Sequence, residues 1–317
     1  MKENTIILEG GLGNRMRVAA AAYAMARRTG IPMRVLWTSQ WGMRCRFDEL
    51  FIDPPPALPV REGAITLRDA QGFEKLLFAR PTWKNLHLPR LLQKMCYRQI
   101  IYAPQIWYLN KEGFDYESWF RKGGTLMTSY RDFCPWTTDD LRQLFRPNER
   151  VRQLVDARTA AFSDYTIGLH IRRTDHQQSI DESPLELFFE TIDREIENYE
   201  NVLPTRKSSP PRGEIERGRG PGRGATIYLA TDDEATKTTL FDRYGDRILT
   251  SPAEATREST DGIREALVEM LALSRTKHIY GSAGSTFSPI AACLGNVPIT
   301  ILQRDGKGAV DLLCQDL

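Results

Sequence analysis

The sequence predicts an α/β protein with two doubly wound domains of mostly parallel strands. The length, a glycine turn near the N-terminus and a strand–helix rhythm from residue 165 onward support this prediction. At 317 residues, the chain has the length of two ordinary domains. Its 41% hydrophobic and 26% charged residues suit buried cores under a polar surface. We expect an N-terminal domain over residues 1–160 and a C-terminal domain over residues 161–317.

The N-terminal segment has the pattern of a βαβ unit. An apolar run over residues 5–9 predicts a buried strand, and a glycine-rich turn follows it at residues 10–13. An alanine-rich helix is expected from about 14 to 29, ending at Gly30, and the next strand at 33–37. A strand, glycine turn, helix and strand in this order open a parallel α/β sheet.

Residues 40–160 have irregular periods, with short helices and long loops expected and no strand order assigned. Asp139 and Asp140 follow Thr137 and Thr138 at the start of a helical stretch. Short polar side chains at that position typically accept hydrogen bonds from the free N–H groups of a helix start. This pair is therefore interpreted as helix-capping chemistry rather than as a catalytic pair.

The strand–helix rhythm returns at residue 165 and predicts the second doubly wound domain. Strands are expected at 165–171, 226–230, 247–250, 277–281 and 297–302. Helices are expected at 184–199, 233–243, 261–275 and 286–294.

Residues 201–224 interrupt this rhythm with a segment rich in Pro, Gly, Ser and Arg. Such a composition buries little apolar surface and predicts a flexible surface insert. A basic arm that contacts an acidic polymer or a membrane surface is the alternative.

Charge and composition exclude several classes of protein. The 43 basic and 41 acidic residues give a formal net charge of +2, so no overall field favours nucleic acid or an anionic membrane. Local basic clusters are a separate matter. No stretch approaches the roughly 18 apolar residues of a membrane helix, and no signal peptide is recognisable. We expect a cytoplasmic protein without a transmembrane segment, peripheral at the inner membrane face if its acceptor is membrane-linked.

Cysteine and histidine are too dispersed to predict a metal site or a disulfide framework. The five cysteines form no C-x-x-C pair, and the four histidines have no ligand spacing. We therefore expect no bound metal.

The strongest local signal is the segment 168–175, a strand that ends in charged side chains. His170, Arg172, Arg173 and Asp175 gather there. Ligands of open α/β sheets bind at the carboxyl ends of strands, and a guanidinium fork suits phosphate. A surface ion pair between Arg173 and Asp175 is the structural alternative.

The glycine turn is the second signal, because it lets backbone N–H groups approach an anion at a helix start. The turn does not match the dinucleotide-binding motif G-x-G-x-x-G, because Met16 stands where the third glycine belongs. The strand at 33–37 also lacks the acidic residue at its end that would bind the ribose. An NAD-dependent oxidoreductase is therefore disfavoured. The candidate ligand-contacting residues of this turn are Gly11, Gly13, Asn14 and Arg15.

A third strand ends in the adjacent residues Asp232 and Asp233. Because neighbouring side chains diverge, they do not resemble a D-x-D metal pair. A carboxylate can instead accept both N–H groups of a guanine edge. One aspartate is expected to read guanine, and Asp233 is expected to be the less likely of the two to serve only as a helix cap.

The fourth segment, residues 280–288, joins a strand to a helix through small hydroxyl residues. Hydroxyl and backbone N–H groups at a helix start can cradle a phosphate. An ordinary capped turn is the alternative. The candidate donor-binding residues here are Ser285, Thr286 and Phe287.

Together these segments resemble the fucosyltransferase superfamily of α1,2-, α1,6- and protein O-fucosyltransferases. Residues 170–175 look like its H-x-R-R-x-D motif, and Thr174 and the run 228–233 are similar to the α1,6 branch. The resemblance covers residues 5–37 and 165–295 and is weak over 40–160, where acceptor contacts would lie.

The resemblance implies a GT-B-like fold of two facing Rossmann-like domains, the second of which binds a GDP-sugar. It also implies inverting transfer of L-fucose from GDP-β-L-fucose to a glycan hydroxyl, without a metal or other cofactor. Arg172 and Arg173 would then stabilise the leaving diphosphate. Asp175, Asp181 and Glu182 are candidates for the base. The alternatives are a transferase for another GDP-sugar and a non-catalytic nucleotide- or glycan-binding relative.

Overall fold

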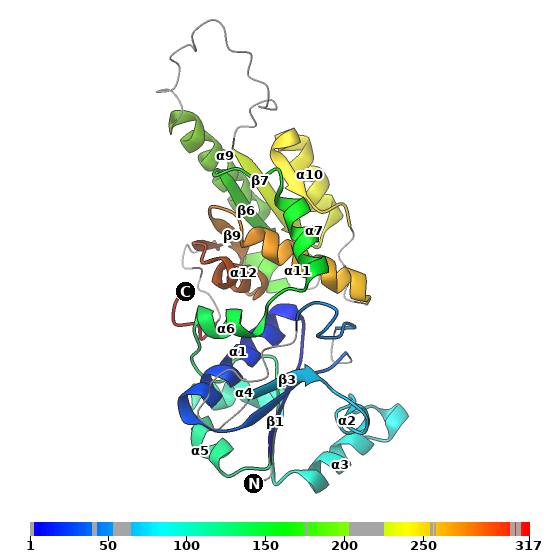
Figure 1. Ribbon diagram of the computed structural model, residues 1–317. Helices are drawn as coiled ribbons and strands as arrows, with labels where there is room; N and C mark the ends of the chain where they lie inside the picture. Colours follow the sequence, from blue (N-terminus) through cyan, green and yellow to red (C-terminus); the bar gives the residue numbers. More distant parts are fainter. Residues whose placement is uncertain are drawn as a thin grey trace, which may run out of the picture. The chain divides into compact units, whose positions relative to one another are not determined.

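The computed structural model describes residues 3–39, 43–52, 65–174, 177–202, 225–253, 256, 258–304, 308 and 312–317. The chain forms two compact α/β units (Figure 1). Unit 1 comprises Met1–Asp156, Ala255–Val268 and Asp311–Leu317, and unit 2 comprises Ala157–Glu254 and Glu269–Val310. The predicted fold class, α/β with two Rossmann-like units, is confirmed.

Unit 1 is built on a five-stranded parallel sheet of order β3-β2-β1-β5-β4. Its strands are β1 (Asn4–Leu8), β2 (Met33–Trp37), β3 (Ile65–Asp69), β4 (Gln99–Ile101) and β5 (Thr125–Ser129). Its helices are α1 (Leu12–Thr29), α2 (Glu74–Leu77), η1 (Trp83–Asn85), α3 (Leu88–Cys96), α4 (Ala103–Lys111), α5 (Tyr116–Arg121) and α6 (Thr138–Leu144). Two further helices, α7 (Glu149–Thr159) and α11 (Thr260–Leu273), each contain a boundary between the units.

Helix α1 is buried along most of its length, and the run Ala19–Ala22 is fully inaccessible. Small side chains allow a helix to pack closely on the strands beneath it. Gly30 ends the helix with φ of 69° and donates its N–H to the carbonyl of Ala26. A positive φ is available to glycine at little cost, so this residue explains where the predicted helix stops.

The region 40–160, for which no strand order was predicted, supplies three strands of this sheet. β5 lies beside β1, and β3 and β4 lie at the edges. The capping interpretation of Asp140 is confirmed. Thr137 Oγ1 accepts from the Asp140 N–H, and the Asp140 carboxylate accepts from the Thr137 N–H at 2.9 Å.

Unit 2 has a second five-stranded parallel sheet, of order β10-β9-β6-β7-β8. Its strands are β6 (Thr166–Ile171), β7 (Thr226–Thr231), β8 (Ile248–Thr250), β9 (Ile279–Ser282) and β10 (Ile299–Leu302). Its helical elements are α8 (Gln177–Glu182), α9 (Leu185–Val202), α10 (Glu234–Tyr244), η3 (Gly245–Arg247) and α12 (Phe287–Gly295).

Each strand and helix predicted after residue 165 is present, with ends shifted by at most three residues. β6 lies in the middle of the sheet, with β7 and β9 on its two sides. The core beside it includes Ile167, Leu169, Phe188 and Ile192. Helix α9 continues to Val202, so the first two residues of the predicted insert 201–224 are helical. The rest of that insert lies outside the described residues.

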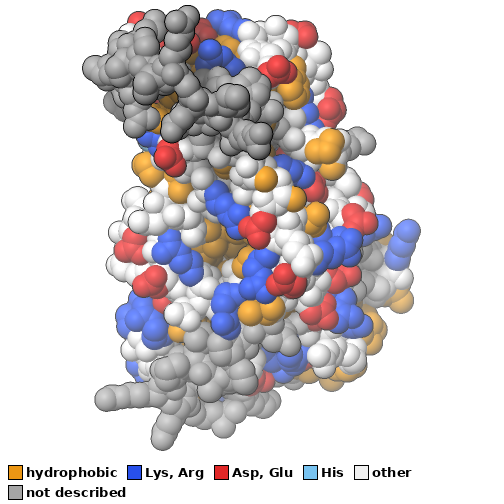
Figure 2. Space-filling view, turned by 45° about the horizontal axis from the view of Figure 1, so that its top comes forward, with side chains coloured by type: hydrophobic (Ala, Val, Ile, Leu, Met, Phe, Trp, Pro, Cys, Tyr) orange, Lys and Arg blue, Asp and Glu red, His pale blue; other side chains and the backbone are white. Residues whose placement is uncertain are grey.

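Acidic and basic side chains are interspersed over the face shown in Figure 2, in keeping with the small net charge. None of the helices that the structure describes has the length and apolar character needed to cross a bilayer.

Asp132 anchors the C-terminal segment to unit 1. Its Oδ2 accepts hydrogen bonds from Trp136 Nε1 at 2.9 Å and from the Leu313 N–H at 2.7 Å. Its Oδ1 lies 3.6 Å from the Arg17 guanidinium, and both side chains are buried. Removal of a buried carboxylate leaves its partners unsatisfied, which costs more than the intact pair contributes.

Replacement Asp132→Ala should therefore lower the free energy of unfolding by about 3–5 kcal/mol. The matched control is Asp139→Ala, because the Asp139 side chain is 87% exposed and lies 3.9 Å from Arg142. That change should cost less than about 1 kcal/mol. Urea unfolding followed by circular dichroism measures both values. Equal unfolding midpoints for the two variants would contradict the anchoring role of Asp132.

Candidate functional site

The backbone turn that follows β6 is held by a carboxylate from the end of β7. The N–H of Arg173 donates to Asp232 Oδ1 at 2.8 Å, and Thr174 Oγ1 donates to Asp232 Oδ2 at 2.7 Å. The Arg172 guanidinium lies 3.6 Å from Asp232 Oδ2. Parallel strands end at the same edge of a sheet, which is why residues 59 positions apart in sequence meet here.

Asp232 is held in its ionised form by these contacts. Burial disfavours the carboxylate charge, but the hydrogen bonds from Arg173 and Thr174 and the charge of Arg172 outweigh that effect and lower the pKa of Asp232. Asp232 therefore acts as a permanent acceptor at neutral pH. It fixes the direction of the chain at the two arginines.

The two arginine side chains have different surroundings. The Arg173 guanidinium donates to the carbonyl of Ile180 at 3.3 Å and to that of Ser183 at 2.9 Å. Arg173 Nε is buried with no hydrogen-bond partner among the described residues. Burial lowers the pKa of Arg173, and the nearby acids Glu186, Asp233 and Asp232 oppose this shift. Arg173 thus ties α8 and the residues after it to the end of β6.

The Arg172 side chain is partly exposed, at 17%. Its N–H donates to Ser282 Oγ at 3.1 Å, and that hydroxyl donates to the carbonyl of His170 at 3.3 Å. Ser282 therefore joins the end of β9 to the end of β6. The backbone of Arg172 is fixed on one side by β9, and its neighbour Arg173 is fixed on the other side by β7.

His170 is buried beneath this turn and is uncharged. Its Nδ1 lies 3.2 Å from Ser288 Oγ, and its ring stacks on Phe287 with 4.8 Å between centroids. Burial, together with the positive charge of Arg172, lowers the pKa of His170 to about 3. At neutral pH this imidazole supplies hydrogen bonding and packing to the site, and no positive charge.

The turn after β9 runs through Ser285 and Thr286 into α12. Gly281 has no room for a side chain, since a Cβ atom there would lie 2.2 Å from Ser288 Oγ. Gly284 has φ of 70°, a left-handed conformation that favours glycine. Thr286 is the N-cap residue of α12, and the Phe287 N–H faces Ser285 Oγ at 3.4 Å. The predicted hydroxyl-rich turn therefore lies beside His170 through Phe287 and Ser288.

Asp233 is a helix cap. Its Oδ2 accepts from the N–H of Thr236 at 2.8 Å and from Thr236 Oγ1 at 2.6 Å, and Asp233 is the N-cap residue of α10. The prediction that Asp233 was the less likely of the two aspartates to cap the helix is wrong. The residue that directly precedes the first helical residue has the geometry for capping, and that residue is Asp233 rather than Asp232.

The candidate bases are placed differently. The Glu182 carboxylate accepts from Gln178 Nε2 and Gln303 Nε2, each at 2.9 Å, which places it beside the loop after β10. Asp181 accepts from Gln177 at 2.8 Å on the exposed side of α8. Neither carboxylate has a hydrogen bond or ion pair with the arginines in the described part of the chain. Asp175 lies outside the described residues.

The glycine turn belongs to unit 1. Gly10 has φ of 77°, and a Cβ atom there would approach Asn14 Nδ2 to 2.9 Å. Gly11 is the N-cap residue of α1, so Gly13 and Asn14 occupy its first turn. The predicted arrangement of glycines at a helix start is present in this unit.

The Arg15 side chain is used inside unit 1. It is fully buried, its Nε donates to the Gly10 carbonyl at 2.9 Å, and its Nη1 donates to the Thr38 carbonyl at 2.6 Å. The guanidinium also lies over the Trp37 ring, 5.1 Å from its centroid. Burial lowers the pKa of Arg15 to about 10, with Glu9 opposing. In this structure Arg15 holds the glycine turn against β2.

Serine side chains that were not predicted from the sequence also join these elements. Ser183 Oγ accepts from the Ala283 N–H at 2.8 Å and donates to the Leu302 carbonyl at 2.5 Å. Ser179 Oγ donates to the Ala283 carbonyl at 2.5 Å. A lone serine has no sequence signal for such a role. Ser282 and Ser288, in contrast, lie in the segment 280–288, which was predicted to bind phosphate.

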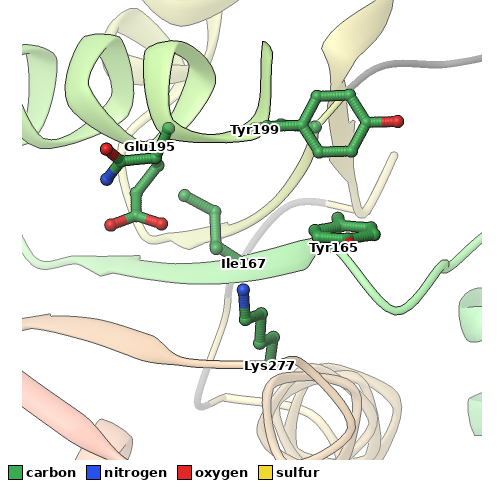
Figure 3. A pocket seen from close by; sticks show the side chains of 7 residues that line it. Tyr165, Ile167, Glu195, Tyr199 and Lys277 are labelled. Atoms are coloured by element: carbon green, nitrogen blue, oxygen red, sulfur yellow. The ribbon is translucent and has the colours of Figure 1, made fainter. Parts of the chain in front are cut away.

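A separate small hollow lies at the opposite edge of the unit 2 sheet (Figure 3). Figure 3 shows Tyr165 and Tyr199 above Lys277, with Glu195 beside them. Tyr165 and Lys277 precede the amino ends of β6 and β9. Glu195 and Tyr199 lie on α9. Its volume of about 70 Å³ is far below the roughly 300–1,000 Å³ of a ligand pocket. The hollow is therefore no candidate for the nucleotide site.

Metal ligands do not gather in the described part of the chain, where no three His, Cys, Asp or Glu side chains are close enough to hold an ion. The cationic groups at the end of β6 are arginines. The arrangement can therefore present fixed positive charge and hydrogen-bond donors to an anion.

The neutral, buried His170 should make the folded protein less stable in acid. Between its folded pKa of about 3 and its ordinary value of 6.5, the unfolded chain binds a proton that the folded chain does not. The free energy of unfolding therefore falls as the pH falls through this window. His170 should account for a loss of about 2 kcal/mol between pH 7 and pH 5. Urea unfolding of the parent and of His170→Gln at both pH values should show that the parent loses about 2 kcal/mol more. Parallel pH dependences for the two proteins would be inconsistent with a buried neutral imidazole.

No protein-family model and no curated protein matches the sequence. Solved structures do match the fold. Fucosyltransferase NodZ from Bradyrhizobium is 17% identical, covers 95% of this chain and 96% of its own, and has a TM-score of 0.58. NodZ α-1,6-fucosyltransferase soaked with GDP-fucose is 18% identical, with coverages of 98% and 100% and a TM-score of 0.60.

Two further solved structures are similar at lower scores. An Arabidopsis thaliana FUT1 variant in complex with GDP is 17% identical over 95% of this chain and 70% of its own, with a TM-score of 0.54. POFUT1 in complex with GDP is 10% identical over 95% of this chain and 99% of its own, also with a TM-score of 0.54. The chain therefore has the fold of these fucosyltransferases, along nearly its whole length.

Proposed function

We propose that this chain is an inverting glycosyltransferase that moves L-fucose from GDP-β-L-fucose to a hydroxyl of a glycan acceptor. The observation that carries the proposal is the pair of arginines after β6, held in place by Asp232. The fold adds support, because structures of three proteins of this fold have been solved with GDP or GDP-fucose. Unit 2 would bind the donor, and unit 1 would supply the acceptor side.

The chemistry requires cationic groups at the diphosphate. Cleavage of the bond between sugar and phosphate builds an oxocarbenium-like sugar and increases the negative charge on GDP. A preorganised donor stabilises that charge more in the transition state than in the ground state. The turn after β6 is preorganised in this sense, because Asp232 and Ser282 fix its backbone before any ligand binds.

We infer different roles for the two arginines from their contacts. Arg172, whose partly exposed guanidinium lies 3.6 Å from Asp232 Oδ2, would contact the diphosphate directly. Arg173 would act mainly by holding α8 and the residue that follows it, through the carbonyls of Ile180 and Ser183. Ser285, Thr286 and Phe287, at the start of α12, would supply further donors for phosphate oxygens.

In unit 1, the backbone of Gly11, Gly13 and Asn14 at the start of α1 would contact the donor. Arg15 would act indirectly, because its side chain is buried against Gly10 and Thr38.

Inversion requires a base that accepts the proton of the attacking hydroxyl. Glu182 is already bonded to Gln178 and Gln303, whereas Asp175 directly follows Thr174 in the sequence. We assign the base to Asp175 first and to Glu182 second.

His170 would pack under the arginines as a neutral side chain. Of the aspartates after β7, Asp232 would orient the arginine turn, and Asp233 would contact guanine only through acceptor capacity left by its capping bonds.

The proposal includes no metal and no other cofactor. Fixed arginine charge would take the part that a divalent cation plays in metal-dependent transferases. A cytoplasmic location, peripheral at the inner membrane face, would bring the chain to a membrane-linked glycan. Another GDP-sugar as donor is the alternative within the same chemistry.

Replacement Arg172→Ala should lower kcat for fucosyl transfer by on the order of 10²-fold or more, because a transition-state charge stabiliser is lost. Arg172→Lys should recover part of the rate, since it keeps the charge without the guanidinium fork. The control is Arg152→Ala, an exposed arginine paired with Glu149. Steady-state kinetics at saturating GDP-fucose gives kcat for all three. Near-normal kcat in Arg172→Ala would remove this residue from the catalytic step.

Incubation with GDP-fucose and a panel of glycan acceptors should yield GDP and a fucosylated product with the α-anomeric configuration. The rate should be unchanged by excess EDTA, because the positive charge at the leaving group comes from side chains. Product NMR measures the anomeric configuration, and GDP release measures the rate. Loss of activity in EDTA with recovery in Mn²⁺ would refute the arginine mechanism. Faster transfer from GDP-mannose than from GDP-fucose would show that GDP-mannose is the preferred donor.

A further inference from the structure

Residues 73–98 of unit 1 carry apolar side chains that are exposed to solvent. The most exposed are Trp83 at 85% and Leu86 at 84%. The others include Phe73, Leu76, Leu91 and Met95. We call the exposed side chains of residues 73–98 the 73–98 surface. Figure 1 shows α2 and α3 of this segment side by side and away from α1 and α6. Clustered exposed apolar side chains typically mark an interaction site.

The two faces of α3 differ in what they contact. Leu92 packs against the core cluster of unit 1, and Gln93 is buried. Leu88, Leu91 and Met95 have the spacing i, i+3, i+7 and are all exposed. This spacing places three apolar side chains on one face of the helix. The exposed apolar stripe is therefore separate from the face that stabilises the unit.

The loop before α3 presents Trp83 and Leu86 in a fixed conformation. The Thr82 N–H donates to Asn85 Oδ1, and Asn85 Nδ2 donates to the Arg80 carbonyl, both at 2.9 Å. Leu86 has φ of 51° and His87 has φ of 53°, a conformation that side chains of this size rarely adopt. Backbone strain of this kind persists where surrounding contacts impose it. The chain thus holds two large apolar side chains in water instead of folding them inward.

The same surface is strongly basic. Its exposed charged side chains are Lys75, Arg80, Lys84, Arg90, Lys94 and Arg98. The one acid of residues 73–98 is Glu74, and its carboxylate is bonded to Arg68 at 2.7 Å. This local excess contrasts with the balanced charge of the whole chain. The partner of this surface should therefore combine an apolar phase with negative charge.

We propose that the 73–98 surface docks the chain on an anionic lipid bilayer. Trp83, Leu86 and the exposed stripe of α3 would enter the boundary between headgroups and acyl chains, and the lysines and arginines would contact lipid phosphates. An amphipathic element with Trp and Leu on one side and basic residues around them binds membranes in this way. Docking does not depend on the transfer reaction proposed above.

A second copy of the chain fits this surface less well. A two-fold symmetric contact would bring the same six cations against each other, and like charges in an interface oppose association. Lysine is also depleted from stable protein interfaces. Nucleic acid offers the negative charge but no apolar phase for the leucines and Met95.

The test is co-sedimentation of the full chain with vesicles of phosphatidylcholine that contain about 30% phosphatidylglycerol, compared with pure phosphatidylcholine. Binding should be strong only to the anionic vesicles and should weaken at high salt. The charge variant Lys84→Glu/Lys94→Glu should bind about tenfold more weakly or worse. The apolar variant Trp83→Ser/Leu86→Ser should lose a similar factor.

Matched controls separate this surface from general effects. Lys122→Glu/Arg150→Glu makes the same change of net charge at other exposed positions of the chain. Leu154→Ser/Phe241→Ser removes two apolar side chains that are 40% and 41% exposed on α7 and α10. Both controls should bind anionic vesicles as the parent does. Equal binding of all variants, or equal binding of the parent to neutral and anionic vesicles, would overturn the proposal.

A spectroscopic measurement does not depend on the stability of the charge variants. Brominated lipids in the same anionic vesicles should quench part of the tryptophan fluorescence of the parent, because Trp83 inserts. The conservative variant Trp83→Phe should still bind and should lose that quenched fraction. Unchanged quenching in Trp83→Phe would refute insertion of this residue. A lipid-free dimer that the Trp83→Ser/Leu86→Ser variant dissociates would assign the surface to a second copy instead.

Discussion

The carboxylate of Asp232 is the constraint on which the candidate site depends. It accepts the Arg173 N–H and the Thr174 hydroxyl and lies beside the Arg172 guanidinium. A chain leaving a strand has many possible directions, and these bonds select one of them. The cost of desolvating Asp232 is offset by the hydrogen bonds and charge that lower its pKa. The two arginines are consequently positioned by the fold before any anion arrives.

The third strand of the site, β9, constrains the same turn from the other side. Ser282 connects the Arg172 N–H to the His170 carbonyl, and Gly281 leaves space for Ser288. His170 lies in the resulting packed layer with Phe287 stacked on its ring. A charged imidazole next to Arg172 would weaken this arrangement, and burial removes that charge. Fixed guanidinium charge above a neutral layer suits a site that must stabilise a leaving diphosphate.

Sequence predicted the central strands well because strands buried in a parallel sheet are continuous apolar runs, as in residues 166–171 and 226–231. The edge strands β3 and β4 were missed because they are short and half-buried, with Arg68 and Gln99 among their residues. The buried strand β5 was also missed, because threonine and serine interrupt its apolar run. The arginine motif was recognisable locally, whereas its contact with Asp232 depends on strand order. Two adjacent aspartates look alike in the sequence, and which of them caps the helix depends on the residue at which the helix begins. Asp232 was favoured as the capping residue, whereas the structure shows that Asp233 caps α10.

The arginine turn after β6 would form the diphosphate site of a guanine nucleotide. Isothermal titration calorimetry of the purified chain with GDP, UDP, ADP and NAD shows whether it does. We expect GDP to bind with one-to-one stoichiometry and most tightly of the four, UDP and ADP to bind much more weakly, and NAD to give no measurable heat. Binding of GDP should weaken strongly in Arg172→Ala, since the bond to phosphate is charge-assisted. No heat with GDP, or tighter binding of NAD than of GDP, would show that this turn is not a guanine nucleotide site.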